Sequence, residues 1–302
     1  MIITSDWGQN KLSMEERQLR DAMRGVLWEE QWRGLSLDEV PDLAFLENRA
    51  KVWLEYDVAK PRRIDPMGWP NEFVGWGSYG WKYKADVVRA GIEVFGSDRV
   101  FMIDTAEGYG FGKVETELGH VLKTYGSRNV WLMSKVARNH LGSSTAVVNA
   151  ARRSRDKLGQ PLDLYQIHWP PPKRNYSVLM SAMKELLEEG TIKRVGVSNF
   201  CAGQLVMAQI AAQDHGFSIE SLQVRVNRLD SSALEYLIPV AKALGLRVIA
   251  HSPFGQGKSW AENRAWLIDH VDALRATGVS HIIPGTNNML HMLENMKIGA
   301  NK

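Results

Sequence analysis

The chain has 302 residues, 44% of them hydrophobic and 24% charged, as in an ordinary globular protein with room for one large domain or two small ones. Its net charge of +3 is small and scattered, which argues against a nucleic-acid partner, and no apolar window approaches the roughly 20 residues that a membrane span needs. The N-terminus lacks a signal-peptide pattern, and the single cysteine, Cys201, excludes an internal disulfide, so we expect a cytoplasmic protein with no metal site built on cysteine pairs.

Residues 1–65 form the first predicted unit, a helical extension. SMEE at 13–16 and SLDE at 36–39 are capping-box patterns, each followed by apolar residues at helical spacing. Such amphipathic helices usually add a layer to the core. The alternatives are a lid or a contact between subunits, which would make the protein a homo-oligomer through this extension.

Residues 66–302 repeat a different pattern, in which short apolar runs alternate with amphipathic segments. Continuous apolar strands separated by helices indicate parallel strands covered by helices. Eight such units predict a closed (β/α)₈ barrel. An open doubly wound sheet is the rival, but GWGSYG at 75–80 matches its glycine fingerprint poorly. The predicted strands are residues 72–77, 100–104, 130–135, 162–168, 194–198, 221–226, 247–251 and 281–285, and clear helical segments are 87–95, 145–159, 178–190 and 234–245.

Polar side chains stand at or near the carboxyl ends of consecutive strands. In a barrel these ends share one rim, where active sites lie. A single lysine or histidine at a strand end is usually a solvated terminus, but several together are hard to explain in that way. The set comprises Asp104, Lys135, His168, Ser198, Asn199, Gln223, His251 and Ser252.

Tyr109 follows Asp104 by five residues, between two glycines that let its loop bring the phenol over Lys135. We expect a nearby ammonium to favour the phenolate and lower the tyrosine pKa, which eases proton transfer. Asp104 would keep the ammonium of Lys135 charged, and His168 could offer an N–H to an oxygen that gains negative charge. This set suits reduction of a carbonyl to an alcohol, with the hydride supplied by a cofactor.

The sequence resembles the aldo-keto reductase superfamily in six ordered blocks. These are DTAEGYGFGKVETELG at 104–119, SKV at 134–136, LDLYQIHWP at 162–170, GVSNF at 196–200, VIAHSPFGQG at 248–257, and IIPGTNN with ENM at 282–296. The resemblance covers residues 72–302. It implies a (β/α)₈ barrel and an NADPH-dependent carbonyl reductase, with NADH as a possible substitute.

Roles follow from the resemblance by motif. Tyr109 would be the general acid, Lys135 and Asp104 would tune it, and His168 would orient the carbonyl. Substrate would meet Trp76, Tyr79, Trp81 and Trp169, although a core position is as good an explanation for the tryptophans. The cofactor would be held by Gly77, Ser78, Asp104, Ser198, Asn199, Gln223, His251, Ser252, Phe254, Gly255, Gly285, Thr286, Asn287, Glu294 and Asn295.

Three features differ from the family pattern. His251 replaces an aromatic residue that stacks on the nicotinamide, the segment after residue 257 is short, and no cation precedes Lys297 after the PGT motif. These features keep two other hypotheses open. One is a redox-neutral lyase, isomerase or dehydratase on the same four residues, and the other is a non-catalytic subunit that binds a partner through the extension. Lys173 and Arg174 hint at an anionic or polyhydroxylated ligand.

Overall fold

The computed structural model of the protein describes residues 68–95, 99–172, 175–227, 230–234, 237–255 and 264–300. The whole predicted extension with both of its capping boxes, Lys173, Arg174 and residues 256–263 lie outside these ranges. The predicted boundary at residue 65 therefore stays a prediction.

Eight parallel strands follow one another around a barrel in chain order. Parallel bridges between Val74 and Ile282 and between Gly77 and Gly285 join the first strand to the last, which closes the sheet. The barrel predicted from the alternating pattern is thus confirmed, and the open sheet is excluded. The strands are β1 (Trp76–Gly77), β2 (Phe101–Asp104), β3 (Val130–Val136), β4 (Leu164–Ile167), β5 (Val195–Ser198), β6 (Ser221–Arg225), β7 (Arg247–His251) and β8 (His281–Ile283).

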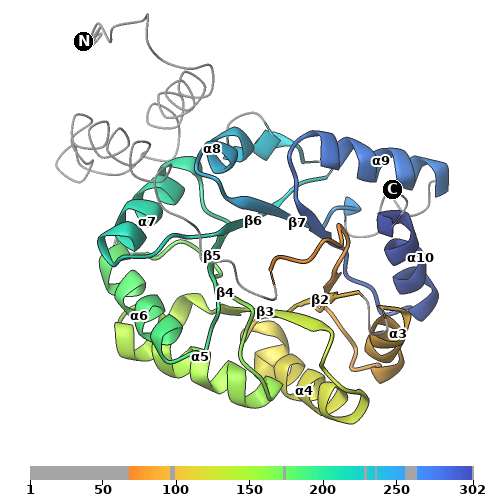
Figure 1. Ribbon diagram of the computed structural model, residues 1–302, viewed down its shortest axis with the longest axis horizontal. Coiled ribbons are helices and arrows are strands. Elements are labelled where there is room, and N and C mark those ends of the chain that lie inside the picture. The colour runs from red at the N-terminus through yellow and green to blue at the C-terminus, as the bar shows by residue number, and fades with distance from the viewer. Residues whose placement is uncertain are drawn as a thin grey trace, which may run out of the picture.

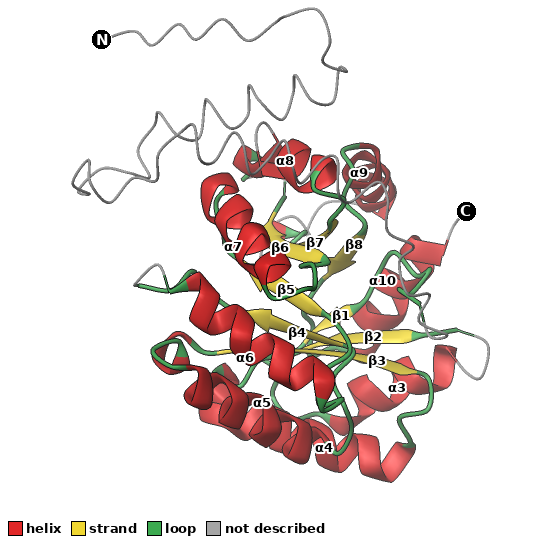
Figure 2. Ribbon diagram, turned by 60° about the vertical axis from the view of Figure 1, so that its left-hand side comes forward, coloured by secondary structure: helices red, strands yellow, loops and turns green. Residues whose placement is uncertain are grey.

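Eight helices in the described ranges form a ring outside the strands (Figure 1). Turned by 60°, the molecule still shows the strands enclosed by helices (Figure 2). None of these helices is long and apolar enough to cross a membrane. They are α3 (Ala85–Phe95), α4 (Lys113–Tyr125), α5 (Ser144–Leu158), α6 (Tyr176–Glu188), α7 (Ala202–Asp214), α8 (Leu237–Ala243), α9 (Arg264–Ala276) and α10 (Met289–Ala300).

The buried apolar side chains form two separate groups, one on each face of the sheet, because successive strand residues point to opposite faces. The larger group lies between strands and helices, and the smaller one fills the barrel with Met102, Trp131, Met133, Leu164, Ile249 and Ile283. Trp69 packs against the smaller group, with its ring centroid 4.9 Å from that of Trp131. The barrel interior is therefore a packed core, and ligands can reach only its ends.

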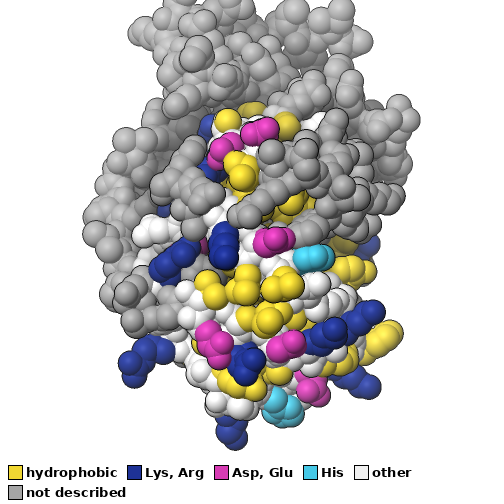
Figure 3. Space-filling view, turned by 90° about the vertical axis from the view of Figure 1, so that its right-hand side faces the viewer, with side chains coloured by type: hydrophobic (Ala, Val, Ile, Leu, Met, Phe, Trp, Pro, Cys, Tyr) yellow, Lys and Arg dark blue, Asp and Glu magenta, His cyan; other side chains and the backbone are white. Residues whose placement is uncertain are grey.

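The β1–β8 seam is tight. A Cβ added to Gly77 would lie 2.9 Å from the carbonyl oxygen of Ile283, so only glycine lets these strands approach so closely. On the outside, over the side that carries α3 and α10, basic and acidic side chains are interspersed (Figure 3).

Candidate active site

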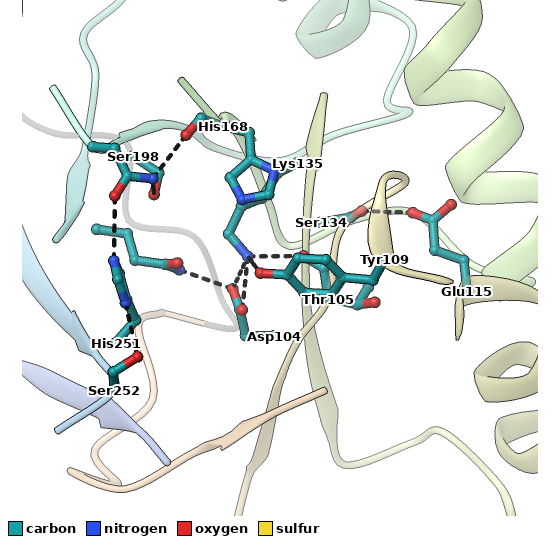
Figure 4. A network of polar contacts seen from close by, with 12 residues as sticks. Asp104, Thr105, Tyr109, Glu115, Ser134, Lys135, His168, Ser198, His251 and Ser252 are labelled. Carbon is teal, nitrogen blue, oxygen red and sulfur yellow. Dashed lines mark hydrogen bonds and ion pairs between the residues drawn. The ribbon is translucent and has the colours of Figure 1, made fainter. Parts of the chain in front are cut away.

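The polar residues predicted at the strand ends do gather at one rim of the barrel. Asp104 ends β2, Lys135 precedes the last residue of β3, and His168 follows β4 directly. Ser198 ends β5 and His251 ends β7, and both lie in the same region (Figure 4).

Lys135 lies at the centre of this group and is fully buried. Its Nζ atom donates to both carboxylate oxygens of Asp104 at 2.7 Å and to the Thr105 carbonyl at 2.9 Å. The Tyr109 hydroxyl lies 3.4 Å from the same nitrogen. Gln223 donates to the Asp104 carboxylate at 2.8 Å, so the carboxylate is bound from both sides. The ammonium, the carboxylate and the phenol are therefore in direct contact.

Tyr109 reaches Lys135 from the loop of residues 105–112 between β2 and α4, the Tyr109 loop. The chain turns there through left-handed conformations, with φ of 54° at Gly110, 56° at Phe111 and 85° at Gly112. Two of the three positions are glycine, which adopts this conformation without steric cost. Gly108, by contrast, has a φ of −75°, so of the two glycines beside Tyr109 only Gly110 needs its conformational freedom.

The pKa of Tyr109 is raised above its usual value, chiefly by burial, while Lys135 acts in the opposite direction. Lys135 thus acts on the tyrosine pKa in the direction expected from the sequence, but burial outweighs the ammonium and the net pKa is raised. Burial would lower the pKa of Lys135, but Asp104 and Tyr109 outweigh it and raise that pKa. At neutral pH the site therefore holds a protonated phenol beside a charged ammonium.

The His168 ring faces Tyr109, with ring centroids 5.6 Å apart and planes at 73°. Burial, Lys135 and His251 lower the pKa of His168 to about 3. The imidazole is therefore neutral at physiological pH, with one N–H to donate.

Beyond His168, a chain of polar contacts runs along the rim to β7 (Figure 4). Asn199 donates to the His168 carbonyl and to Ser198 Oγ, both at 3.0 Å, and its Oδ1 lies 3.3 Å from His251 Nε2. His251 Nδ1 lies 3.3 Å from Ser252 Oγ. Asn199 and Ser252 have φ of 60° and 52°, so the backbone turns sharply at both strand ends. Phe254 and Gly255 continue this edge and are buried.

The residues after β8 complete the opposite side of the rim. Asn287 is used within the protein, because its amide donates to the Gly80 carbonyl at 3.0 Å and accepts from the Lys82 N–H at 2.7 Å. Thr286 accepts a bond from Trp76 Nε1 through its carbonyl at 3.1 Å. Gly285 lies against the β1 backbone, and Glu294 and Asn295 stand on α10.

The aromatic residues predicted for the substrate separate into two pairs. Trp76 and Trp81 are 0% and 4% exposed and pack edge to face at 5.6 Å, so they belong to the core. Tyr79 and Trp169 are 75% and 47% exposed and lie beside the rings of Tyr109 and His168. Only this second pair stands where a ligand could touch it.

Two glutamates next to the site, one buried and one largely buried, were missed from the sequence. Glu107 and Glu115 flank Tyr109 and have exposed side-chain fractions of 9% and 0%. The available signal was the place of both in the block 104–119. Glu115 stands in the first turn of α4, where a glutamate is usually a solvated charge that suits the helix dipole.

The family comparison matches residues 74–265 to the model described as Aldo/keto reductase family. Aldo-keto reductase YhdN of Bacillus subtilis is 32% identical over 55% of this chain and 50% of its own length. The uncharacterized oxidoreductase Mb2320 of Mycobacterium bovis is 36% identical over 74% of this chain and 70% of its own. Among solved structures, an aldo/keto reductase from Klebsiella pneumoniae in complex with NADP and acetate superposes with a TM-score of 0.60 at 26% identity, over 76% of this chain and 86% of that one.

Proposed function

Because the chain belongs to the aldo/keto reductase family, we propose that it is an NAD(P)H-dependent oxidoreductase that reduces an aldehyde or ketone to an alcohol. The observation that carries this proposal is the contact of 3.4 Å between the Tyr109 hydroxyl and the buried ammonium of Lys135. The matched part of the Bacillus protein is only half of its length, so the activity rests on this site and not on that name.

The rim offers groups that fit a nicotinamide nucleotide. Ser78 Oγ and Asn295 Oδ1 are buried and have no hydrogen-bond partner among the described residues. The hydroxyl can donate to or accept from a polar ligand, and the amide oxygen can accept from one. Ser198, Asn199 and Gln223 carry the hydroxyl and amide groups that suit a carboxamide. NADP and NADPH are named for two of the similar Klebsiella structures, which favours NADPH here, with NADH as the alternative.

The residues of the site would orient the substrate and supply the proton, and the cofactor would supply the hydride. When bound, the nicotinamide supplies the hydride that no side chain can provide. His168, as a neutral imidazole, donates its N–H to the carbonyl oxygen of the substrate and orients it. Tyr109 donates its proton to that oxygen as it gains negative charge, and Lys135 stabilises the phenolate that remains. Asp104 keeps Lys135 charged and in place.

The phenol can be removed with little change in shape by Tyr109→Phe. We expect kcat for a panel of aldehydes to fall by about 100-fold to 10,000-fold, the usual contribution of general acid–base catalysis. Binding of NADPH, followed by protein fluorescence, should change little, because the residues proposed to hold the cofactor remain.

Two outcomes would contradict the proposal. The first is a wild-type protein that binds neither NADPH nor NADH. The second is turnover of a substrate by protein freed of all nucleotide, which would instead favour the redox-neutral alternative.

A further inference from the structure

The Tyr109 loop is held by side chains that the proposed chemistry does not use. Glu107 lies near its start, two residues before Tyr109, and Glu115 lies just beyond its end, in the first turn of α4. Without support for its loop, the Tyr109 hydroxyl would vary in its distance from Lys135 Nζ. The contacts of these two carboxylates are therefore important for the position of the loop.

Glu115 connects the end of the loop to β3. Its Oε1 accepts from Ser134 Oγ at 2.6 Å, and Ser134 is the residue before Lys135. Because neighbouring strand residues point to opposite faces, Lys135 faces the barrel interior while Ser134 faces the helices (Figure 4). Glu115 therefore bonds to the helix-facing side of β3, at the residue next to Lys135.

Lys157 on α5 extends this contact to the loop itself. Its Nζ lies 3.6 Å from Glu115 Oε2 and 3.4 Å from the Gly112 carbonyl. A Cβ at Gly112 would lie 2.7 Å from the same nitrogen, so glycine is required for the lysine to approach. The last residue of the Tyr109 loop is thereby joined to Glu115 and to β3.

Glu107 connects the start of the loop to β3 on the other side of Lys135. Its Oε1 accepts from the Ala137 N–H at 2.5 Å and lies 2.8 Å from His140 Nδ1. Its own N–H donates to the Lys135 carbonyl at 3.3 Å. Ala137 comes two residues after Lys135 and Ser134 comes one residue before it. The two glutamates therefore contact the chain on opposite sides of Lys135.

We propose that Glu107 and Glu115 are positioning residues, which tie both ends of the Tyr109 loop to β3 on either side of Lys135 and so set the distance from the Tyr109 hydroxyl to the ammonium. This inference rests on the proposed carbonyl reduction. The carboxylates touch neither substrate nor cofactor, and they act through Tyr109.

The principal test is Glu115→Ala, compared with Glu115→Gln. The alanine variant loses the bond from Ser134, and we expect kcat to fall by about 10-fold to 100-fold, since a small displacement of a catalytic group has costs of this size. KM should stay within about twofold, because no ligand contact is removed. The glutamine variant keeps an oxygen to accept from Ser134 and should recover most of the loss.

Asp163 provides a matched control at the other end of the barrel. It is also a buried carboxylate bonded to β3, since it accepts from the Leu132 N–H at 2.8 Å and from Lys193 Nζ at 2.8 Å. Asp163→Asn should lower stability without lowering kcat. Equal kcat losses in Asp163→Asn and Glu115→Ala at similar stability would overturn the inference, because the effect would then be one of general folding.

A second readout does not depend on turnover. The ammonium lowers the pKa of Tyr109, so a hydroxyl moved away from it should ionise at a higher pH. We expect the tyrosinate absorbance change, isolated by subtracting the matching Tyr109→Phe variant, to shift upward in Glu115→Ala and not in Asp163→Asn. If the wild-type protein reduces no carbonyl, the proposed function fails but this titration still tests the positioning. If Glu115→Ala does not fold, Glu107→Ala, which loses the bond from the Ala137 N–H, is measured in the same way, and an unshifted titration there overturns the inference.

Discussion

At the scale of single residues, the pair formed by Lys135 and Asp104 controls the site. Both side chains are nearly or fully withdrawn from water, at 0% and 3% exposed. Two isolated charges in such a place would be very unfavourable, and only their mutual contact, with Gln223 and the Thr105 carbonyl, makes them tolerable. Each charge therefore depends on its partner to remain in this buried place.

This dependence predicts the effect of Lys135→Met. Removing the ammonium leaves the Asp104 carboxylate buried without a countercharge, so we expect the free energy of unfolding to fall by about 3–5 kcal/mol. Adding Asp104→Asn to the same chain should recover part of that loss. Denaturant unfolding of both single variants and the double variant measures the coupling, and strictly additive losses would show that the two charges do not depend on each other.

At the scale of elements, the loop after β8 supports the loop after β1. Asn287 bonds the backbone at Gly80 and Lys82 with its side-chain amide and so spans the seam where the barrel closes. The segment it holds begins at Tyr79, which stands beside Tyr109. A residue selected from the sequence as a cofactor contact is, in this structure, a brace between two loops of the rim.

We therefore predict that Asn287→Ala loosens residues 78–84 with little effect on the whole fold. Two exposed hydrogen bonds are lost, each with a net value of at most about 1 kcal/mol. Amide hydrogen exchange should become faster at residues 80–82. Asn288→Ala is the neighbouring control, because Asn288 accepts from the Leu290 and His291 N–H groups and should loosen only the start of α10.

At the scale of the whole molecule, three histidines with lowered pKa values make stability depend on pH. Burial lowers the pKa of His281 and of His251 to about 4 each, and that of His168 to about 3. Below about pH 6.5 the unfolded chain takes up protons at these positions while the folded chain does not. The contribution of the neutral histidines to the free energy of unfolding is thus fully present above that pH and is lost as the pH falls toward 4.

His281 allows this pH dependence of stability to be tested, since it is 2% exposed and stacks on Trp69 with ring centroids 5.6 Å apart. Its shift corresponds to about 3 kcal/mol lost between about pH 6.5 and pH 4. His281→Phe keeps a stacked ring without a titrating group, so its unfolding free energy should fall less over this window. His120, which is 70% exposed, is the control, and an unchanged slope in His281→Phe would contradict the prediction.

Sequence alone predicted the barrel because eight apolar runs alternate with helical segments, and it predicted the rim because parallel strands bring their carboxyl ends together. It could place Asp104, Lys135 and His168 at one rim because each stands at or near the end of an apolar run. It could not separate Trp76 from Tyr79, since burial depends on which segments close over a side chain. Glu115 was overlooked because its partners, Ser134 and Lys157, come from other elements.

The enclosure of Lys135 also decides which reaction this amine does not undergo. A lysine that forms an imine must be neutral, so that its nitrogen can attack the carbonyl carbon, and it must be accessible to the carbonyl compound; enzymes that use one lower its pKa. Here the pKa is raised, the side chain is fully buried, and Asp104, Thr105 and Tyr109 surround the nitrogen. If the proposed substrate is right, an aldehyde at Tyr109 would meet a cation with no lone pair to offer, and Lys135 would not form an imine with it.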